Sequence, residues 1–127
     1  MKPSVLILLA EDEFLIASAI ETDLQDAGFT VRHAGNGNDA ISALDERVGF
    51  SGLITDIRLG DGPDGWEVAR HAREINPSIP IVYMSGDSAL DHSAYGVPDS
   101  VMLQKPFVAA QLITAITTLL NAVPPQQ

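Results

Sequence analysis

Short apolar runs alternate with amphipathic segments along almost the whole chain, and this alternation predicts its secondary structure. Five runs have the length of strands, and they cover residues 5–10, 30–34, 52–56, 79–85 and 100–104. Four of the runs are nearly continuous in apolar residues, as strands that are buried on both faces are. The run TVRHA at 30–34 alternates instead, so we expect this strand at an edge of a sheet.

The segments between these runs carry apolar residues at helical spacing. Gly28 and Pro77 supply stop signals after the first and third of these segments. Residues 86–99 leave room for only about two helical turns, at 88–95, so this fourth helix is expected to be short or mobile. The other four predicted helices cover residues 13–27, 38–46, 65–75 and 108–123.

Strands that alternate with helices predict the α/β class, with a parallel sheet covered by helices on both faces. An edge position for the second strand fits the strand order 2-1-3-4-5, and right-handed crossovers then fix a doubly wound, flavodoxin-like topology with five strands and five helices. At 127 residues the chain is expected to form a single domain over 1–127. Its core is expected at about residues 4–123, with a flexible tail at 124–127.

The composition narrows the choice of partners. Seventeen Asp and Glu residues against seven Lys and Arg residues give a net charge of −10, and phosphate backbones need clustered Lys and Arg, so nucleic acid is not expected as a partner. The chain has no cysteine, which excludes disulfides and thiol chemistry and suits a cytoplasmic location. No apolar stretch approaches the length of a membrane span, so no membrane association is expected.

Polar residues follow four of the predicted strands at their carboxyl ends. Glu11 and Asp12 follow the first strand, Asp56 ends the third, Ser85 ends the fourth and Lys105 follows the fifth. Ligands of open parallel sheets bind outside the carboxyl ends, where the winding reverses between the first and third strands. We therefore expect three carboxylates, a hydroxyl and an ammonium group to converge on one rim of the sheet.

Three neighbouring carboxylates repel one another unless a positive charge lies among them. Oxygen ligands with open coordination positions suit Mg²⁺, with Mn²⁺ as an alternative. Lys105 supplies a second positive charge at the same rim. The set predicts an anion site built on a metal ion, and a phosphoryl group fits it.

Four motifs, VLILLAEDE, LITDIRL, IVYMSGD and MLQKPF, occur in this order along the chain. Together they resemble the receiver domain of two-component response regulators, over about residues 5–123, and the chain resembles the stand-alone type of this domain. The resemblance implies that Asp56 is the phosphoacceptor, Ser85 the switch hydroxyl and Lys105 the lysine of the site. It also implies a cis peptide bond before Pro106.

The resemblance further implies the metal ligands. They are Glu11, Asp12, Asp56 and the backbone carbonyl of Arg58, with Asp12 as a direct ligand. Glu11 is one methylene longer than the aspartate often present at its position, so it is expected to reach the metal through water.

The function implied by this resemblance is a phosphorylation-dependent signalling switch. Asp56 would take the phosphoryl group of a phosphohistidine on a histidine kinase or a histidine phosphotransfer protein, with Mg²⁺. The change would alter binding of an output protein at residues 86–123, or the phosphoryl group would be relayed onward. We expect a monomer or weak dimer that does not turn over small molecules.

Three alternatives remain open from the sequence. A phosphate sink would use the same site without any output protein. A Mg²⁺-dependent phosphohydrolase acting through an aspartyl-phosphate usually has a second Asp two residues after the nucleophile, where this chain has Arg58. A flavodoxin-like cofactor binder would need a phosphate-binding loop after the first strand, where this chain has acids.

The chain departs from the family pattern on the fifth strand. Met102 stands where the family usually has an aromatic residue three positions before the lysine. Tyr83 is expected on the same face as Ser85, and we hypothesise that it replaces this aromatic residue in the switch. Asp61 and Asp64, in the loop 60–65, are interpreted as turn residues rather than as extra metal ligands. The three histidines are His33, His71 and His92. Their spacing along the chain is not that of metal ligands.

Overall fold

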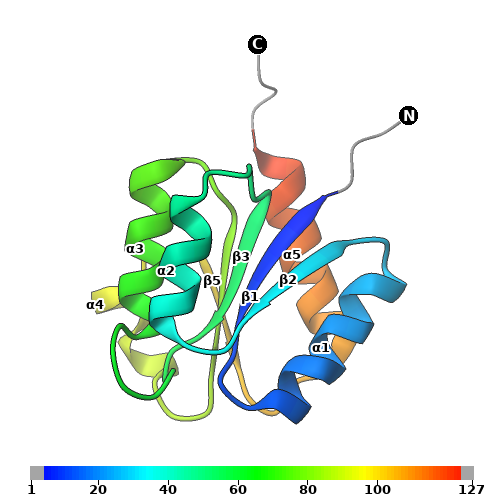
Figure 1. Cartoon of the computed structure of the whole chain (residues 1–127). Coiled ribbons are helices and arrows are strands. Elements are labelled where there is room, and N and C mark those ends of the chain that lie inside the picture. Colours follow the sequence, from blue (N-terminus) through cyan, green and yellow to red (C-terminus); the bar gives the residue numbers. More distant parts are fainter. Residues whose placement is uncertain (1–4, 124–127) are drawn as a thin grey trace.

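The computed structural model describes residues 5–123. Within this range five parallel strands form one sheet in the order β2-β1-β3-β4-β5, with helices on both faces (Figure 1). The predicted fold class and strand order are therefore confirmed. The flexible tail expected at 124–127, and residue 4 at the other limit of the expected core, lie outside the described residues.

The strands lie close to their predicted positions. Their bounds are β1 Leu6–Ala10, β2 Thr30–Ala34, β3 Gly52–Asp56, β4 Ile81–Ser85 and β5 Val101–Gln104. The prediction that β4 begins at Ile79 was wrong by two residues, because Pro80 has no N–H group to donate to a sheet. The prediction of an edge position for β2 is confirmed.

Five α-helices connect and follow the strands within the described residues. Their bounds are α1 Phe14–Asp26, α2 Gly37–Asp45, α3 Gly65–Ile75, α4 His92–Tyr95 and α5 Ala109–Ala122. The expectation of a short fourth helix is confirmed, since α4 has 4 residues and follows a single 3-10 turn, η1, at Ala89–Asp91. Neither of these two short elements has a buried residue, so little apolar surface holds this segment on the sheet.

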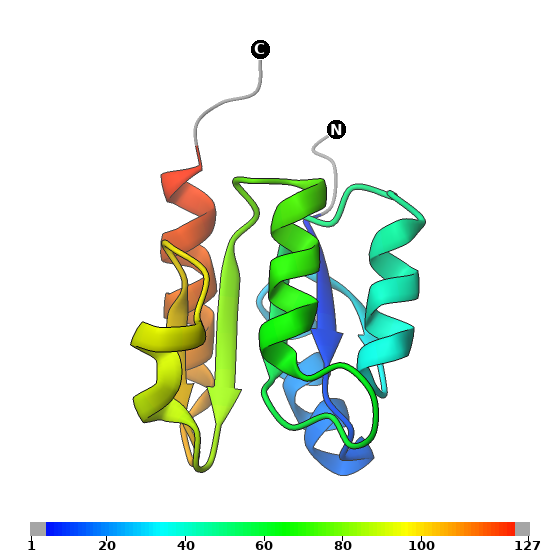
Figure 2. The ribbon, with the colours of Figure 1, turned by 90° about the vertical axis from the view of Figure 1, so that its left-hand side faces the viewer.

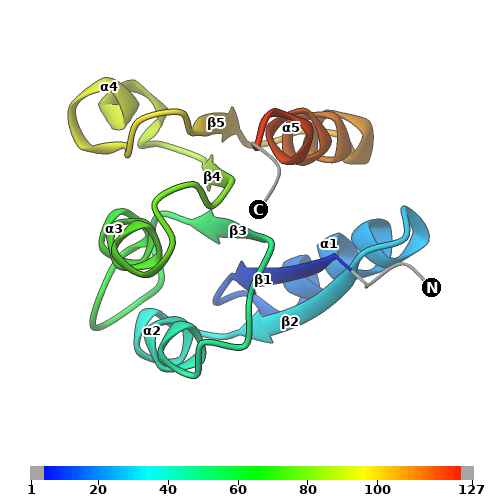
Figure 3. The ribbon, with the colours of Figure 1, turned by 90° about the horizontal axis from the view of Figure 1, so that it is seen from above.

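Alternate side chains of each strand enter two separate cores. On one face Leu8, Leu53 and Ile81 pack against α2 and α3, and on the other face Ile7 and Ile54 pack against α1 and α5. Figure 3, seen from above, shows α2, α3 and α4 on one side of the sheet and α1 and α5 on the other. Burial on both faces explains why β1, β3 and β4 consist mostly of apolar residues.

Local hydrogen bonds fix where the helices begin and end. Asn36 and Asp64 cap α2 and α3, since their side chains accept from the backbone N–H groups of Asp39 at 2.8 Å and Glu67 at 3.0 Å. The sequence had suggested that Asp64 is a turn residue. The structure shows instead that it caps α3. Gly28 ends α1 with a φ of +100°, a left-handed conformation that glycine adopts at low cost.

A close approach between β3 and α3 positions the loop after the third strand. A methyl group on Gly65 would lie 2.1 Å from the carbonyl oxygen of Asp56, and the Gly65 N–H donates to the carbonyl of Ile57 at 2.7 Å. Only a glycine fits at the start of α3 in this arrangement. Figure 2 shows β1 (blue) and β4 (yellow-green) pointing toward the same end of the molecule, where this loop also lies.

Candidate functional site

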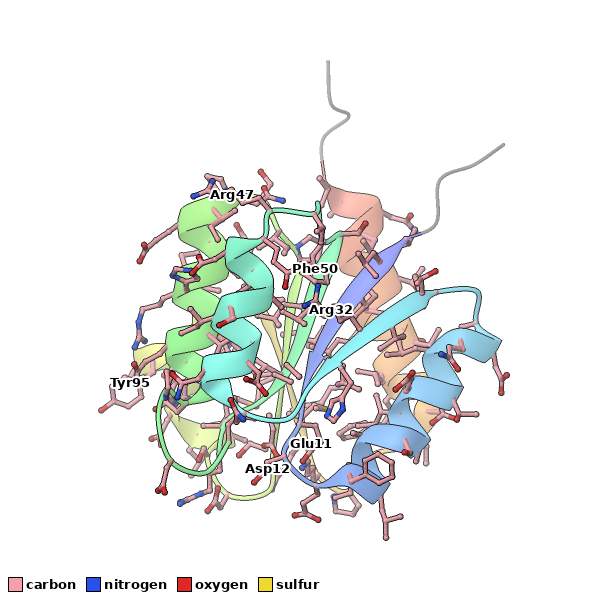
Figure 4. The ribbon with its side chains drawn as sticks, viewed as in Figure 1. Glu11, Asp12, Arg32, Arg47, Phe50 and Tyr95 are labelled. Carbon is pink, nitrogen blue, oxygen red and sulfur yellow. The ribbon has the colours of Figure 1, made fainter. Side chains whose placement is uncertain are left out.

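The three predicted carboxylates meet at the carboxyl end of the sheet. One carboxylate oxygen each of Glu11, Asp12 and Asp56 lies within 4.8 Å of the others, and within the described residues this is the only such group of three or more Asp, Glu or His residues. Figure 4 shows Glu11 and Asp12 together just beyond the end of β1. Asp12 is exposed, whereas Glu11 is fully buried and Asp56 is 8% exposed. The convergence expected from the strand order is thus present.

Lys105 reaches the two buried carboxylates from beyond β5. Its Nζ lies 3.0 Å from Asp56 Oδ2 and 3.3 Å from Glu11 Oε2. Burial by itself lowers the pKa of Lys105, but the hydrogen bond and charge of Asp56, with those of Glu11, outweigh it and raise that pKa. Lys105 therefore carries its positive charge at the centre of the site. The Lys105–Pro106 peptide bond is cis, as the resemblance implied.

Glu11 is held in one orientation by contacts on both sides. Its Oε1 accepts from the backbone N–H of Glu13 at 3.1 Å, and its backbone carbonyl accepts from His33 Nε2 at 2.7 Å. Burial raises the pKa of Glu11 to about 7, and the negative charge of Asp56 adds to this rise. Lys105 only partly offsets this rise, so burial of the carboxyl group dominates the pKa of Glu11.

Asp56 presents one carboxylate oxygen to its own backbone and the other to Lys105. Its Oδ1 accepts from the N–H of Ile57 at 2.8 Å, and its Oδ2 is the oxygen bound to Lys105. The carboxylate opens into a pocket of about 480 Å³ at the molecular surface. The residues lining this pocket are Asp12, Glu13, Asp56, Arg58, Gly86, Asp87 and Lys105. A group that approaches Asp56 through the pocket meets acids and bases from four loops.

Ser85 lies at the same end of the sheet, where its hydroxyl is engaged by its own loop. The residue is 1% exposed, and Ser85 Oγ accepts from the backbone N–H groups of Asp87 at 3.2 Å and Ser88 at 2.6 Å. The backbone carbonyl of Ser85 accepts from the N–H of Lys105 at 2.8 Å, which joins the ends of β4 and β5. Both of these contacts are accepted by the oxygen, so they leave the hydroxyl hydrogen available to donate to a group on Asp56.

An ion pair that was not predicted from the sequence lies at the edge of the pocket. Arg58 Nη2 lies 2.8 Å from Asp87 Oδ2, and both side chains are largely exposed. The pair was detectable in principle, since each residue follows the site residue of its strand, Asp56 or Ser85, by two positions. The register pairs Asp56 with Met84, so Asp87 lies one residue beyond the position that corresponds to Arg58, which is within reach of a long arginine side chain.

Tyr83 is buried beneath this end of the sheet rather than exposed at it. Its ring centroid lies 4.7 Å from that of Trp66, and its hydroxyl accepts from the backbone N–H of Val97 at 3.1 Å. Met102 is its register partner on β5, so Tyr83 lies beside the position where the family usually has its aromatic residue. Its role in a switch remains a hypothesis.

These features define a class of protein: a doubly wound sheet whose carboxyl rim holds an acidic pocket and a lysine paired with its carboxylates. A model of the family described as response regulator receiver domain matches residues 7–117. The chain belongs to this family of signalling domains.

Two relatives and one solved structure illustrate the similarity. The response regulator receiver protein CpdR of Brucella abortus (strain 2308) is 37% identical over 118 residues, which are 91% of this chain and 97% of the relative. The probable transcriptional regulatory protein SilR of Salmonella typhimurium is 30% identical over 91% of this chain, which spans only 50% of that relative. A crystal structure of a response regulator receiver protein from Sinorhizobium medicae WSM419 is 51% identical, with a TM-score of 0.94, and the match covers 95% of this chain and 98% of that one.

Among residues 5–123, no helix combines the length and the apolar character needed to cross a bilayer.

Proposed function

We propose that Asp56 accepts a phosphoryl group in a Mg²⁺-dependent reaction, and that the modified domain then changes its binding to another protein. The observation that carries this proposal is the environment of the Asp56 carboxylate. It opens into a surface pocket, lies 3.0 Å from the Lys105 ammonium group, and has two further carboxylates within 4.8 Å. A nucleophilic carboxylate beside fixed positive charge is suited to phosphoryl transfer.

The donor set fits a hard divalent cation. Asp12 and Asp56 would bind Mg²⁺ directly, together with the backbone carbonyl of Arg58, and Glu11 would act through a bound water. All of these donors are oxygens, the ligand type that Mg²⁺ prefers. When bound, the cation would neutralise charge on the transferring group. The clustering of Glu11, Asp12 and Asp56, with one oxygen of each within 4.8 Å of the others, supports this assignment.

The positions of the side chains support the following transfer step. A carboxylate oxygen of Asp56 forms a bond to phosphorus as the P–N bond of a phosphohistidine breaks, and the electron pair of that bond stays on the imidazole. Lys105 then pairs with a phosphoryl oxygen, and the Ser85 hydroxyl donates its hydrogen to another. Water later attacks the phosphorus, releases phosphate and restores the carboxylate, so the modification is temporary.

The donor is proposed to be a histidine kinase or a histidine phosphotransfer protein, and the output is proposed to be a protein that binds the 86–123 face. Leu90 is 97% exposed and Tyr95 is 56% exposed on this face, so apolar surface is available to a partner. A phosphate sink would use the same chemistry without this partner. The phosphohydrolase alternative is weaker, because the position two residues after Asp56 holds a cation that is paired with Asp87.

An intact-mass measurement tests the proposal. We expect incubation with acetyl phosphate and Mg²⁺ to add the mass of one phosphoryl group, and we expect Asp56→Asn or a metal chelator to abolish the addition. Asp61→Asn is the matched control, since it removes an exposed carboxylate of the neighbouring loop that does not line the pocket. A mass gain that persists in Asp56→Asn would show that the phosphoryl group is placed elsewhere.

A further inference from the structure

The Arg58–Asp87 pair connects the loop after β3 with the loop after β4. It is bidentate, since Arg58 Nη2 lies 2.8 Å from Asp87 Oδ2 and Arg58 Nε donates to Asp87 Oδ1 at 3.2 Å. Both residues line the pocket into which Asp56 opens. The guanidinium group is therefore close enough to interact electrostatically with a phosphoryl group on Asp56.

Asp87 also takes part in the turn that holds the Ser85 hydroxyl. The Asp87 N–H donates to Ser85 Oγ at 3.2 Å, and the Ser88 hydroxyl donates to Asp87 Oδ1 at 3.0 Å. The backbone N–H of Ser88 donates to the same Ser85 Oγ at 2.6 Å. Arg58 thus anchors, through one carboxylate, the turn that leads into η1 and α4.

The Arg58–Asp87 pair is exposed to solvent, so breaking it should change the stability of the protein little. The side chains of Arg58 and Asp87 are 76% and 56% exposed, and ion pairs in such positions contribute little to stability. A phosphoryl group on Asp56 would add a second negative charge and three acceptor oxygens beside the same guanidinium. Arginine binds phosphate oxygens with the same forked geometry that it uses for carboxylates, so the two anions compete for one cation.

We propose that the Arg58 guanidinium leaves Asp87 and binds the phosphoryl oxygens when Asp56 is phosphorylated. Once the Arg58 guanidinium has left, the Asp87 carboxylate no longer has this partner. The turn around Ser85 then loses the contact that holds it to the loop after β3. The short η1–α4 segment then loses one of its attachments, while the hydrogen of the Ser85 hydroxyl is available to donate to the phosphoryl group. This inference rests on the proposed function of Asp56, and it assigns the Arg58 side chain a role separate from that of its backbone carbonyl.

The exchange predicts opposite effects for the two members of the pair. Beryllofluoride is a suitable probe, because it binds a carboxylate oxygen and imitates a phosphoryl group. Its affinity in the presence of Mg²⁺ is measured by titration, followed through backbone amide resonances. Arg58→Ala should weaken the affinity about tenfold, because a bidentate, charge-assisted contact is lost. Asp87→Asn should strengthen it by about two- to fivefold, because the competing anion has gone.

A second readout follows the guanidinium itself. The Arg58 Nε–Hε resonance should shift on addition of beryllofluoride, since its acceptor changes. Asp87→Asn should move this resonance in the free protein and leave it unchanged in the beryllofluoride complex. The matched control is the exposed Arg32–Glu46 pair, whose residues do not line the pocket. Arg32→Ala and Glu46→Gln should leave the affinity for beryllofluoride unchanged.

The outcomes separate this inference from the function on which it rests. If the parent protein neither binds beryllofluoride nor gains a phosphoryl group on Asp56, the proposed function is wrong. If it does both, but Asp87→Asn fails to strengthen binding or the Arg58 resonance is the same in both states, the exchange is wrong and the function stands.

Discussion

Electrostatic imbalance characterises the site at the scale of single residues. Glu11 and Asp56 are both buried, and Lys105 is the ammonium group that contacts them both. Burial disfavours the charged form of Glu11 more strongly than the interaction with Lys105 favours it. The pKa of Glu11 therefore rises to about 7. The acidic site therefore destabilises the metal-free protein, as binding sites that await a ligand commonly do.

Replacing Glu11 by Gln should stabilise the metal-free protein at alkaline pH. The folded-state pKa of about 7 lies above the ordinary value of 4.5, so the stability linked to this proton is present below pH 4.5 and lost as the pH rises through 7. Glu11→Gln should therefore raise the free energy of unfolding by about 1–2 kcal/mol at pH 8.

Urea unfolding in a metal chelator, repeated between pH 4.5 and pH 8, measures this effect. The difference between variant and parent should shrink toward zero as the pH falls. Glu74→Gln removes an exposed acid and is the control. A Glu11→Gln variant that is no more stable than the parent at pH 8 would mean that the buried charge is already compensated.

At the scale of elements, close packing at the start of α3 fixes the backbone around the acceptor. Gly65 brings the helix against the end of β3, and a Cβ there would overlap the carbonyl group of Asp56. The proposed metal ligand Arg58 lies in the loop between these two elements. The loop geometry therefore depends on a residue that has no side chain.

Gly65→Ala is expected to lower the free energy of unfolding by about 2–3 kcal/mol, because the helix start must move away from β3. Intrinsic helix propensity alone would give the opposite sign, since alanine is the better helix former. Chemical denaturation measures the change. Gly35→Ala is the control, because nothing lies within 4 Å of its added methyl group and its effect should stay within about 0.5 kcal/mol. An equal loss in both variants would refute the steric explanation.

The hydroxyl of Tyr83 attaches the segment after α4 to the sheet. Tyr83→Phe leaves the N–H of Val97 without its acceptor, and we expect a loss of about 1 kcal/mol in stability and faster hydrogen exchange at the Val97 amide. Tyr95→Phe, at a residue that is 56% exposed, should change neither quantity. Unaltered exchange at Val97 in Tyr83→Phe would show that this hydrogen bond does not hold the segment.

At the scale of the whole molecule, the parallel topology directs the carboxyl ends of all five strands to one end. That end collects Glu11, Asp12 and Asp56 in a chain whose net charge is already −10. Local and overall charge both favour a cation, and a ligand that binds only the folded state stabilises it.

Millimolar Mg²⁺ should therefore raise the unfolding temperature, with a gain of about 1.4 kcal/mol at ten times its Kd. Thermal unfolding with Mg²⁺, compared with NaCl at equal ionic strength, separates site binding from general screening. The gain should be lost in Asp12→Asn. An equal gain from NaCl, or one that survives in Asp12→Asn, would argue against the proposed metal site.

The sequence by itself determined the fold class, the strand order and the set of residues at the carboxyl rim. It could do so because burial on both faces leaves continuous apolar runs, and because parallel strands bring residues that follow each run to the same end. The positions of Asp56 and Lys105 were predictable for this reason, as was the short fourth helix, whose segment has too few residues before Gly96.

Only the tertiary structure decided how these residues are partnered. The burial of Glu11 beside exposed Asp12, the capping role of Asp64 and the Arg58–Asp87 pair all depend on distances between segments far apart in the chain. Hydrophobic patterns report which face of an element is buried, whereas charge pairing and pKa depend on ångström-scale separations that patterns do not contain.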